Sequence, residues 1–99
     1  MIYRVRYTRA ARDDLMRLYR YLLDRDVDAA AHAAEAIEQG VAMLRRFPFT
    51  CRKIDAGNPF LRELIVSFGT SGYILLFEIE AAEQVTILAV RHQREDDYH

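Results

Sequence analysis

Most of the side chains that could form a functional site lie near the end of the chain. A run of strand-forming residues, Val85 to Val90, leads directly into a polar cluster that contains Arg91, His92, Arg94 and Tyr98. His92 could transfer a proton or carry a positive charge, and the arginines could hold a phosphate or a carboxylate through paired hydrogen bonds. The same cluster could instead be a solvated tail in which Arg91 closes the strand with an ion pair. The residues alone leave both interpretations open.

Other residues offer weaker chemistry. His32 has Glu35 and Glu38 nearby, so a metal site is conceivable, but a solvated histidine on a helix is the simpler interpretation. Cys51 stands beside Arg52-Lys53, and these cations could lower the pKa of its thiol. The sequence contains no phosphate-binding glycine loop, dinucleotide fingerprint, HExxH motif or GxSxG motif. We therefore expect no cofactor and no metal.

Composition is that of one ordinary globular domain, residues 1–99. The chain is 52% hydrophobic and 29% charged, and it has no apolar run long enough to span a bilayer. Its single cysteine excludes an internal disulfide and a cysteine-based zinc site. A bacterial-type cytoplasm is the expected compartment. The net charge of −1 does not favour non-specific DNA binding.

Charge is unevenly distributed along this nearly neutral chain. Residues 45–62 carry one acid, Asp55, against five cations, which are Arg45, Arg46, Arg52, Lys53 and Arg62. Residues 63–90 carry four glutamates and no base. A solvated, mixed surface is the simplest interpretation of this pattern.

The first third of the chain predicts a strand and a helix. Residues 2–7 alternate between apolar and polar side chains, as expected of a half-exposed strand. Thr8 is a suitable N-cap for a helix over Arg9–Arg25. Asp13 and Asp14 are interpreted as charges near the helix start, where the helix dipole favours them.

A second helix is expected over Ala29–Arg46, with Asp28 as its cap and Pro48 beyond its end. Gly40 inside this helix indicates a close approach to another element. The two helices should form an antiparallel hairpin, because only a few residues join them.

The rest of the chain predicts a loop at residues 47–59 and then three strands, over residues 60–68, 73–80 and 85–90. The order β-α-α-β-β-β predicts an α+β fold, in which the helical hairpin packs on a small, mainly antiparallel sheet. The last three strands should form a meander, and the first strand must pair with a strand distant in sequence.

Three phrases in this order resemble the ParE/RelE toxin superfamily: LREL at 61–64, GY at 72–73 and VTILAVRHQREDDY at 85–98. The last phrase favours the ParE branch. The resemblance implies a cytoplasmic bacterial toxin of a type II toxin–antitoxin system, neutralised by a ParD-like antitoxin whose C-terminal segment wraps it. ParE members poison DNA gyrase, whereas RelE relatives are ribosome-dependent mRNA endonucleases.

The two branches differ at the middle hairpin strand. RelE-type ribonucleases have an arginine after the tyrosine of that strand, but here Tyr73 is followed by Ile74. The resemblance therefore favours a non-enzymatic toxin that binds gyrase through the C-terminal cluster named above, Arg91, His92, Arg94 and Tyr98. The alternatives are a ribonuclease that uses Arg62, Arg91, His92 and Tyr98, or a degenerate member that acts only in complex formation.

The antitoxin is expected to cover the helical hairpin. Its candidate contacts on the first helix are Leu15, Tyr19, Leu22 and Leu23, although the same residues could simply be core. Such an exposed apolar surface would also favour homo- or hetero-oligomers. Direct DNA binding is expected only through the antitoxin.

Overall fold

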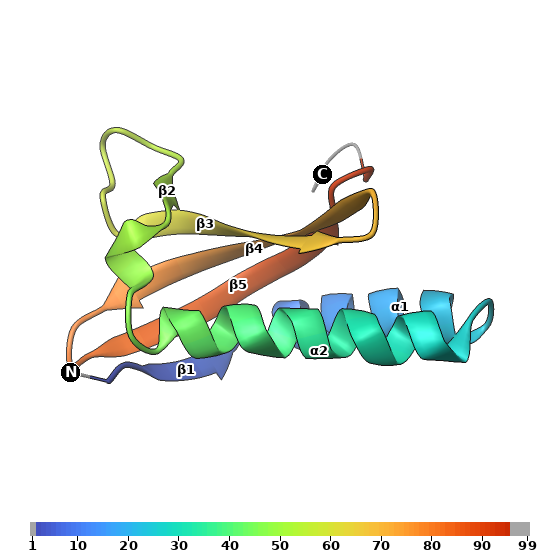
Figure 1. Cartoon of the computed structure of the whole chain (residues 1–99). Helices are drawn as coiled ribbons and strands as arrows, with labels where there is room; N and C mark the ends of the chain where they lie inside the picture. Colours follow the sequence, from blue (N-terminus) through green and yellow to red (C-terminus); the bar gives the residue numbers. More distant parts are fainter. Residues whose placement is uncertain (1, 96–99) are drawn as a thin grey trace.

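Two helices cover one face of a five-stranded sheet (Figure 1). The computed structural model describes residues 2–95. Its elements are β1 (Arg4–Tyr7), α1 (Arg9–Leu23), α2 (Val27–Leu44), a 3-10 turn (Pro48–Thr50), β2 (Arg52–Lys53), β3 (Leu61–Phe68), β4 (Ser71–Glu80) and β5 (Gln84–His92). This arrangement confirms the predicted α+β class. No helix in the described part of the chain is long and apolar enough to cross a membrane.

The strand order across the sheet is β1-β5-β4-β3-β2. The last three strands form the predicted antiparallel meander, and β1 finds its partner in β5, with which it runs parallel. The short strand β2 was not predicted; its two residues pair with Glu63 and Arg62 of β3 and add a fifth strand at the edge. A two-residue strand with no apolar alternation is too short to give a sequence signal.

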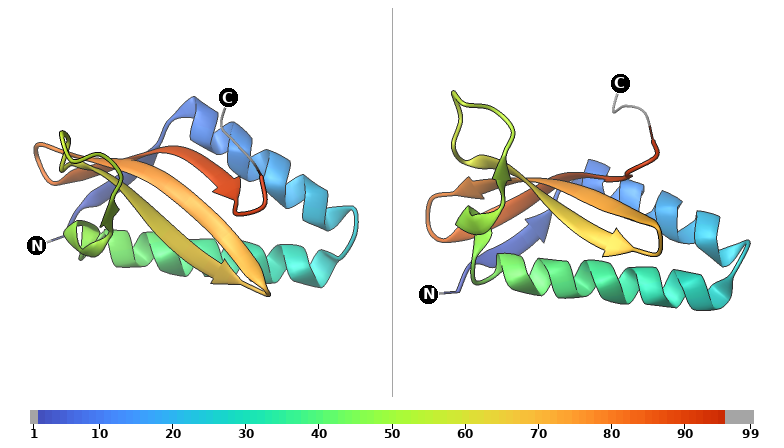
Figure 2. Two further views of the ribbon diagram at one scale, coloured as in Figure 1. Left: turned by 90° about the horizontal axis from the view of Figure 1, so that it is seen from above. Right: turned by 45° about the horizontal axis from the view of Figure 1, so that its top comes forward.

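Both helices begin at side-chain caps, but not everywhere at the predicted residue. The Thr8 hydroxyl accepts the backbone N–H of Ala11, as expected. The cap of α2 is Asp26, which accepts from the N–H of Ala29, so the prediction of Asp28 was wrong. Helix α2 therefore begins two residues earlier than predicted, and it also ends two residues earlier, at Leu44. Seen from above, the helices diverge from the turn that joins them (Figure 2).

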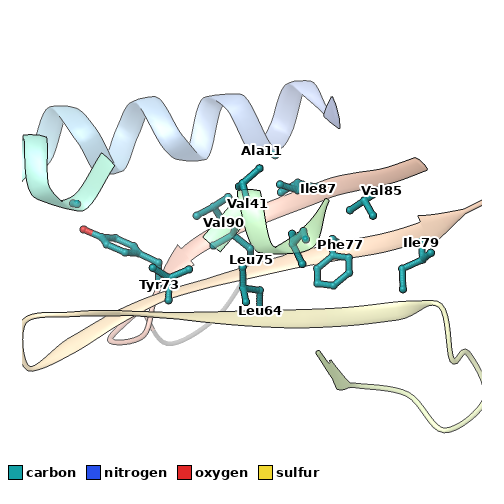
Figure 3. Close-up of a cluster of buried hydrophobic side chains, with 13 residues drawn as sticks. Ala11, Val41, Leu64, Tyr73, Leu75, Phe77, Ile79, Val85, Ile87 and Val90 are labelled. Carbon is teal, nitrogen blue, oxygen red and sulfur yellow. The ribbon is translucent and has the colours of Figure 1, made fainter. Parts of the chain in front are cut away.

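The core lies between the helices and the inner face of the sheet (Figure 3). Its largest fully buried side chains include Phe77, Leu75 and Ile87. Gly40 confirms the predicted close approach, because a Cβ built there would lie 2.9 Å from Val66 Cγ2 on β3. Tyr73 lies at one end of the cluster, with its hydroxyl directed away from the other labelled side chains (Figure 3).

Candidate functional site

The candidate site begins where β5 loses its parallel neighbour. Pairing with β1 stops at Ile87, so the following residues of β5 have no strand on that side. Side chains of α1 and its cap replace the missing strand. The Thr8 hydroxyl donates to the Leu88 carbonyl (3.1 Å), and the Asp14 carboxylate accepts from the Val90 N–H (2.9 Å). Asp14 therefore supports the sheet, and its interpretation as a helix-dipole charge was wrong, since it lies outside the first turn.

Glu95 continues this covering of the strand edge. Its carboxylate accepts from the His92 N–H (2.8 Å) and forms an ion pair with Arg17 (2.9 Å), while its carbonyl accepts from Arg91 (3.0 Å). Burial raises the pKa of the Glu95 carboxyl. The His92 N–H and the Arg17 cation together lower it by more than burial raises it, so the pKa lies below its ordinary value. Residues 91–95, here named the C-terminal arm, are thus held against α1 by one carboxylate.

His92 takes part in this arm through both ring nitrogens. Its Nδ1 accepts from the Arg94 N–H (3.1 Å) and therefore carries no hydrogen. The ring hydrogen consequently lies on Nε2, which donates to the Ser71 hydroxyl (2.9 Å). The ring also packs edge-on against Tyr73, with centroids 5.4 Å apart. A general base needs an unoccupied nitrogen lone pair, and this hydrogen-bonding pattern offers none.

The structure places Arg62 and Arg91 on opposite faces of the sheet. Arg91 is opposite Ile74 and Arg62 is opposite Phe77, and residues an odd number of positions apart along a strand point to opposite faces. The two guanidinium groups therefore do not converge on one phosphate. His92 shares the inner face with Arg62 but lies at the other end of the sheet, opposite Tyr73.

Arg62 instead fixes a loop. Only 7% of the residue is exposed, and its guanidinium donates to the carbonyls of Phe49 (2.8 Å), Cys51 (2.8 Å) and Pro59 (2.7 Å). Three charge-assisted hydrogen bonds to backbone carbonyls account for this buried cation. Two members of the proposed ribonuclease set, Arg62 and Arg91, are therefore not brought together. The fourth member, Tyr98, lies outside the described residues.

The Cys51 thiol is not activated by the cations beside it. Burial raises the pKa of its thiol, and this effect exceeds the lowering that Arg62 and the Thr50 hydroxyl cause. The raised pKa does not support a reactive thiol and agrees with the simpler interpretation of Cys51 as an ordinary small residue.

A groove of about 420 Å³ runs between α1 and α2. Three of the four predicted antitoxin contacts line it, namely Leu15, Tyr19 and Leu22, whereas Leu23 does not. Helix α2 supplies the opposite wall, which includes Ile37 and Val41. The hairpin as a whole was the expected antitoxin surface, but no residue of α2 was named, because an apolar helical stripe has the same pattern whether it is buried or open.

A second groove, of about 710 Å³, lies between α1, the β3–β4 turn and the C-terminal arm. It is lined by apolar residues of α1 and by polar residues that include Ser71, His92 and Arg94. The two grooves share Leu18, Leu22 and Tyr73. Ser71 and Arg17 were also missed, since a turn serine and a helical arginine carry no sequence signal of a shared site.

The fold and this arrangement define a small α+β protein with a helical hairpin, two apolar grooves and a basic C-terminal arm. Residues 5–97 match the family model described as the ParE toxin of the type II toxin–antitoxin system parDE. The chain therefore belongs to this family, within the ParE/RelE superfamily of type II toxins.

Individual relatives agree with this assignment. A curated protein named Toxin RelE3, from Caulobacter vibrioides, is 35% identical over 85 residues, which cover 86% of this chain and 88% of the relative. The fold also resembles a chromosomal ParDE system from P. aeruginosa (TM-score 0.67, 18% identity, 92% of this chain and 96% of that chain). A RelBE2 toxin–antitoxin complex from Mycobacterium tuberculosis is similar too (TM-score 0.62, 28% identity, 94% and 100%). Relatives thus bear the names of both branches.

Proposed function

We propose that this toxin acts by binding rather than by catalysis and that its target is DNA gyrase. The observation that carries the proposal is the hydrogen bonding of His92, whose two ring nitrogens are both used within the protein. The separation of Arg62 and Arg91 on opposite faces of the sheet supports it. Cleavage of a phosphodiester needs cations directed at one phosphate and an acid or base within reach, whereas inhibition by binding needs only a complementary surface.

The C-terminal arm is the proposed gyrase contact. Arg94 is exposed and lines the second groove, and His92 forms part of the same surface. Arg91 is held at the base of the arm by the Glu95 carbonyl. Tyr98, which lies outside the described residues, completes the proposed set. Because the arm is anchored to the end of a buried strand, little conformational entropy is lost when a partner binds it.

A ParD-like antitoxin is the proposed inhibitor of this toxin in the bacterial cytoplasm. Its proposed site is the α1–α2 groove, where Met16 and Tyr19 are 49% and 39% exposed. An amphipathic helix presents apolar side chains at spacings of three and four residues, and such a row fits an apolar groove between two helices. The RelBE2 relative, a toxin–antitoxin complex at 28% identity, supports an antitoxin partner.

Two activity assays on the purified toxin test the target. Gyrase supercoiling should be inhibited, and mRNA in an in vitro translation reaction should remain uncleaved. Arg94→Ala should weaken the inhibition, while Arg12→Ala, at an exposed position of α1 that lines neither groove, should not. Cleaved mRNA with normal supercoiling would establish the ribonuclease alternative, and inactivity in both assays would indicate the degenerate form.

The antitoxin site has its own matched pair of variants. Met16→Asp places a charge in the α1–α2 groove and should lower the affinity for the cognate antitoxin at least about tenfold. Val27→Asp alters an equally apolar side chain that is 66% exposed and lines neither groove, so affinity should not change. Equal affinities for both variants would place the antitoxin elsewhere.

A further inference from the structure

Exposed apolar side chains are concentrated on the loop between α2 and β3. Among the described residues, ten large apolar side chains are exposed, and four of them belong to this loop: Phe47, Phe49, Ile54 and Phe60. None of the four lines either groove. These residues together with Arg46, Arg52 and Lys53 are named the loop surface. Two of the four, Phe49 and Phe60, are in contact, and exposed apolar patches commonly mark interaction sites.

The loop that carries these side chains is held in place rather than free. Arg62 links its two arms, because it donates to Phe49 and Cys51 on one arm and to Pro59 on the other. Within the loop, Asp55 accepts from the Gly57 N–H (2.9 Å) and Asn58 accepts from the Phe60 N–H (3.1 Å). A chain fixed in this way presents its apolar side chains at a lower entropic cost of binding.

The two central rings are also positioned by contact. Phe49 and Phe60 pack edge-to-face with centroids 6.2 Å apart, and the Arg62 guanidinium lies 5.4 Å from the Phe49 centroid. Each ring remains 48% exposed. Aromatic side chains that are rigid and half-exposed are typical of the anchors that contribute most to protein–protein binding.

The loop surface also carries cations. Arg46, Arg52 and Lys53 are exposed, and Arg52 forms an ion pair with Glu63 (2.6 Å). The carboxylate of Asp55, the acid of this loop, accepts a backbone N–H. The electrostatic complement of the loop surface is therefore a partner with negative charge around apolar side chains.

We infer that the loop surface docks an acidic protein segment with bulky apolar side chains, and that this segment belongs to the target, an assignment that rests on the proposed function. The loop rises from the sheet on the side away from the helices (Figure 1), at the end opposite the C-terminal arm, which lies against α1. Neither the loop surface nor the C-terminal arm lines the α1–α2 groove, so one target can contact both without occupying the proposed antitoxin site.

A protein segment fits the loop surface better than a nucleic acid does. Single-stranded nucleic acids need open ring faces and a row of cations along the backbone. Here Phe49 and Phe60 pack against each other, and Arg62 lies over the Phe49 ring. The chain as a whole carries a net charge of −1.

The test compares growth arrest by the wild-type chain and three double variants of it, expressed from one promoter while the antitoxin is controlled from another. The double variant Phe49→Ser/Phe60→Ser removes both anchors, and Arg46→Glu/Lys53→Glu reverses the charge without altering the rings. The matched control is Ile2→Ser/Val27→Ser, because both residues are exposed, at 60% and 66%, and lie outside the loop. Supercoiling inhibition and antitoxin affinity are measured on the purified proteins.

Both loop variants should need at least about tenfold more toxin for the same inhibition, and both should keep the wild-type antitoxin affinity within about twofold. The control should behave as wild type in every assay. Retained antitoxin affinity also shows that the variants fold.

The results that would contradict the loop inference can be distinguished from those that would contradict the gyrase proposal. Wild-type potency of both loop variants overturns the inference and leaves the gyrase proposal standing. Arrest without loss of supercoiling overturns the gyrase proposal alone, and the growth assay still decides the role of the loop. A wild-type chain that causes no arrest removes both. Binding of a single-stranded oligonucleotide that depends on Phe49 and Phe60 assigns the surface to nucleic acid and overturns the inference.

Discussion

Replacement of Arg62 by methionine separates a structural role for this residue from a phosphate-binding one. Methionine retains much of the aliphatic volume of arginine but donates no hydrogen bonds. The variant therefore removes the contacts to the Phe49, Cys51 and Pro59 carbonyls and leaves the packing of the residue, which is only 7% exposed, largely intact. We expect a loss of stability.

The size of this loss follows from the three hydrogen bonds. A hydrogen bond from a charged donor contributes about 1.5–3 kcal/mol net, and a neutral one about 1 kcal/mol. The three carbonyls lie in a surface loop, where water can replace part of each contact, so we take about 1 kcal/mol for each. The expected loss is about 3 kcal/mol. In a domain of this size, that corresponds to a melting temperature lower by roughly 12–24 °C.

Urea unfolding of the purified toxin, followed by circular dichroism, measures this difference. Arg52→Met is the matched control, since Arg52 lies in the same loop region but its side chain is 59% exposed and pairs only with Glu63. Exposed pairs of this kind contribute about 0.2–1 kcal/mol. An Arg62→Met variant that is as stable as the control would refute the structural role and return Arg62 to the list of possible phosphate contacts.

Three further measurements test the packing and the arm. Gly40→Ala should lower the unfolding free energy by about 1 kcal/mol, because contacts of 2.9 and 3.0 Å to Val66 and Leu64 outweigh the gain in helix propensity; a stabilised variant would show that β3 yields. Asp14→Ala should lower the unfolding free energy by about 1–2 kcal/mol, because the Val90 N–H loses its acceptor. Asp13→Ala, at an exposed position, should change it by no more than about 0.5 kcal/mol. Equal effects of the two variants would contradict the role of Asp14 in covering the edge of β5. The pKa of Glu95 is lower in the folded than in the unfolded state. Its contribution to stability is therefore present above the unfolded pKa of about 4.3 and is lost as the pH falls through the folded pKa. Glu95→Gln should flatten the acid side of a stability–pH curve, and an unchanged slope would show that Glu95 contributes nothing there.

Regular patterns allowed most of the fold to be predicted. Thr8 was identified correctly as a cap, and the apolar runs between turn residues gave the three strands of the meander. The errors have local causes. Asp26 and Asp28 are equally good caps by residue type, and only the backbone conformation, extended at Asp26, decides between them. β2 is held by pairing with β3 and by the Arg52–Glu63 ion pair rather than by an apolar pattern.

The candidate site was less predictable because its contacts join distant residues. The polar residues of the arm were visible in the sequence, but the partners that fix their roles were not. Ser71 determines where the His92 ring hydrogen lies, and Asp14 and Arg17 come from a helix far away in the chain. Arg62 was one of the four residues that the ribonuclease alternative placed against a phosphate. The three loop carbonyls that occupy it depend on how residues 47–60 fold back over β3.

The α1–α2 groove and the C-terminal arm both depend on helix α1, and the reason lies at the end of β1. Because β1 stops at Tyr7 and the chain turns into α1, the second half of β5 is covered by side chains of α1 and by Glu95 instead of by a strand. Arg17 on the same helix contacts Asp14 and Glu95, so the position of the C-terminal arm depends on the position of α1. That helix also forms a wall of both grooves. A ligand in the α1–α2 groove therefore contacts α1, the helix that positions the C-terminal arm. A shift of α1 by a fraction of a turn would break the Arg17–Glu95 ion pair that holds residues 91–95.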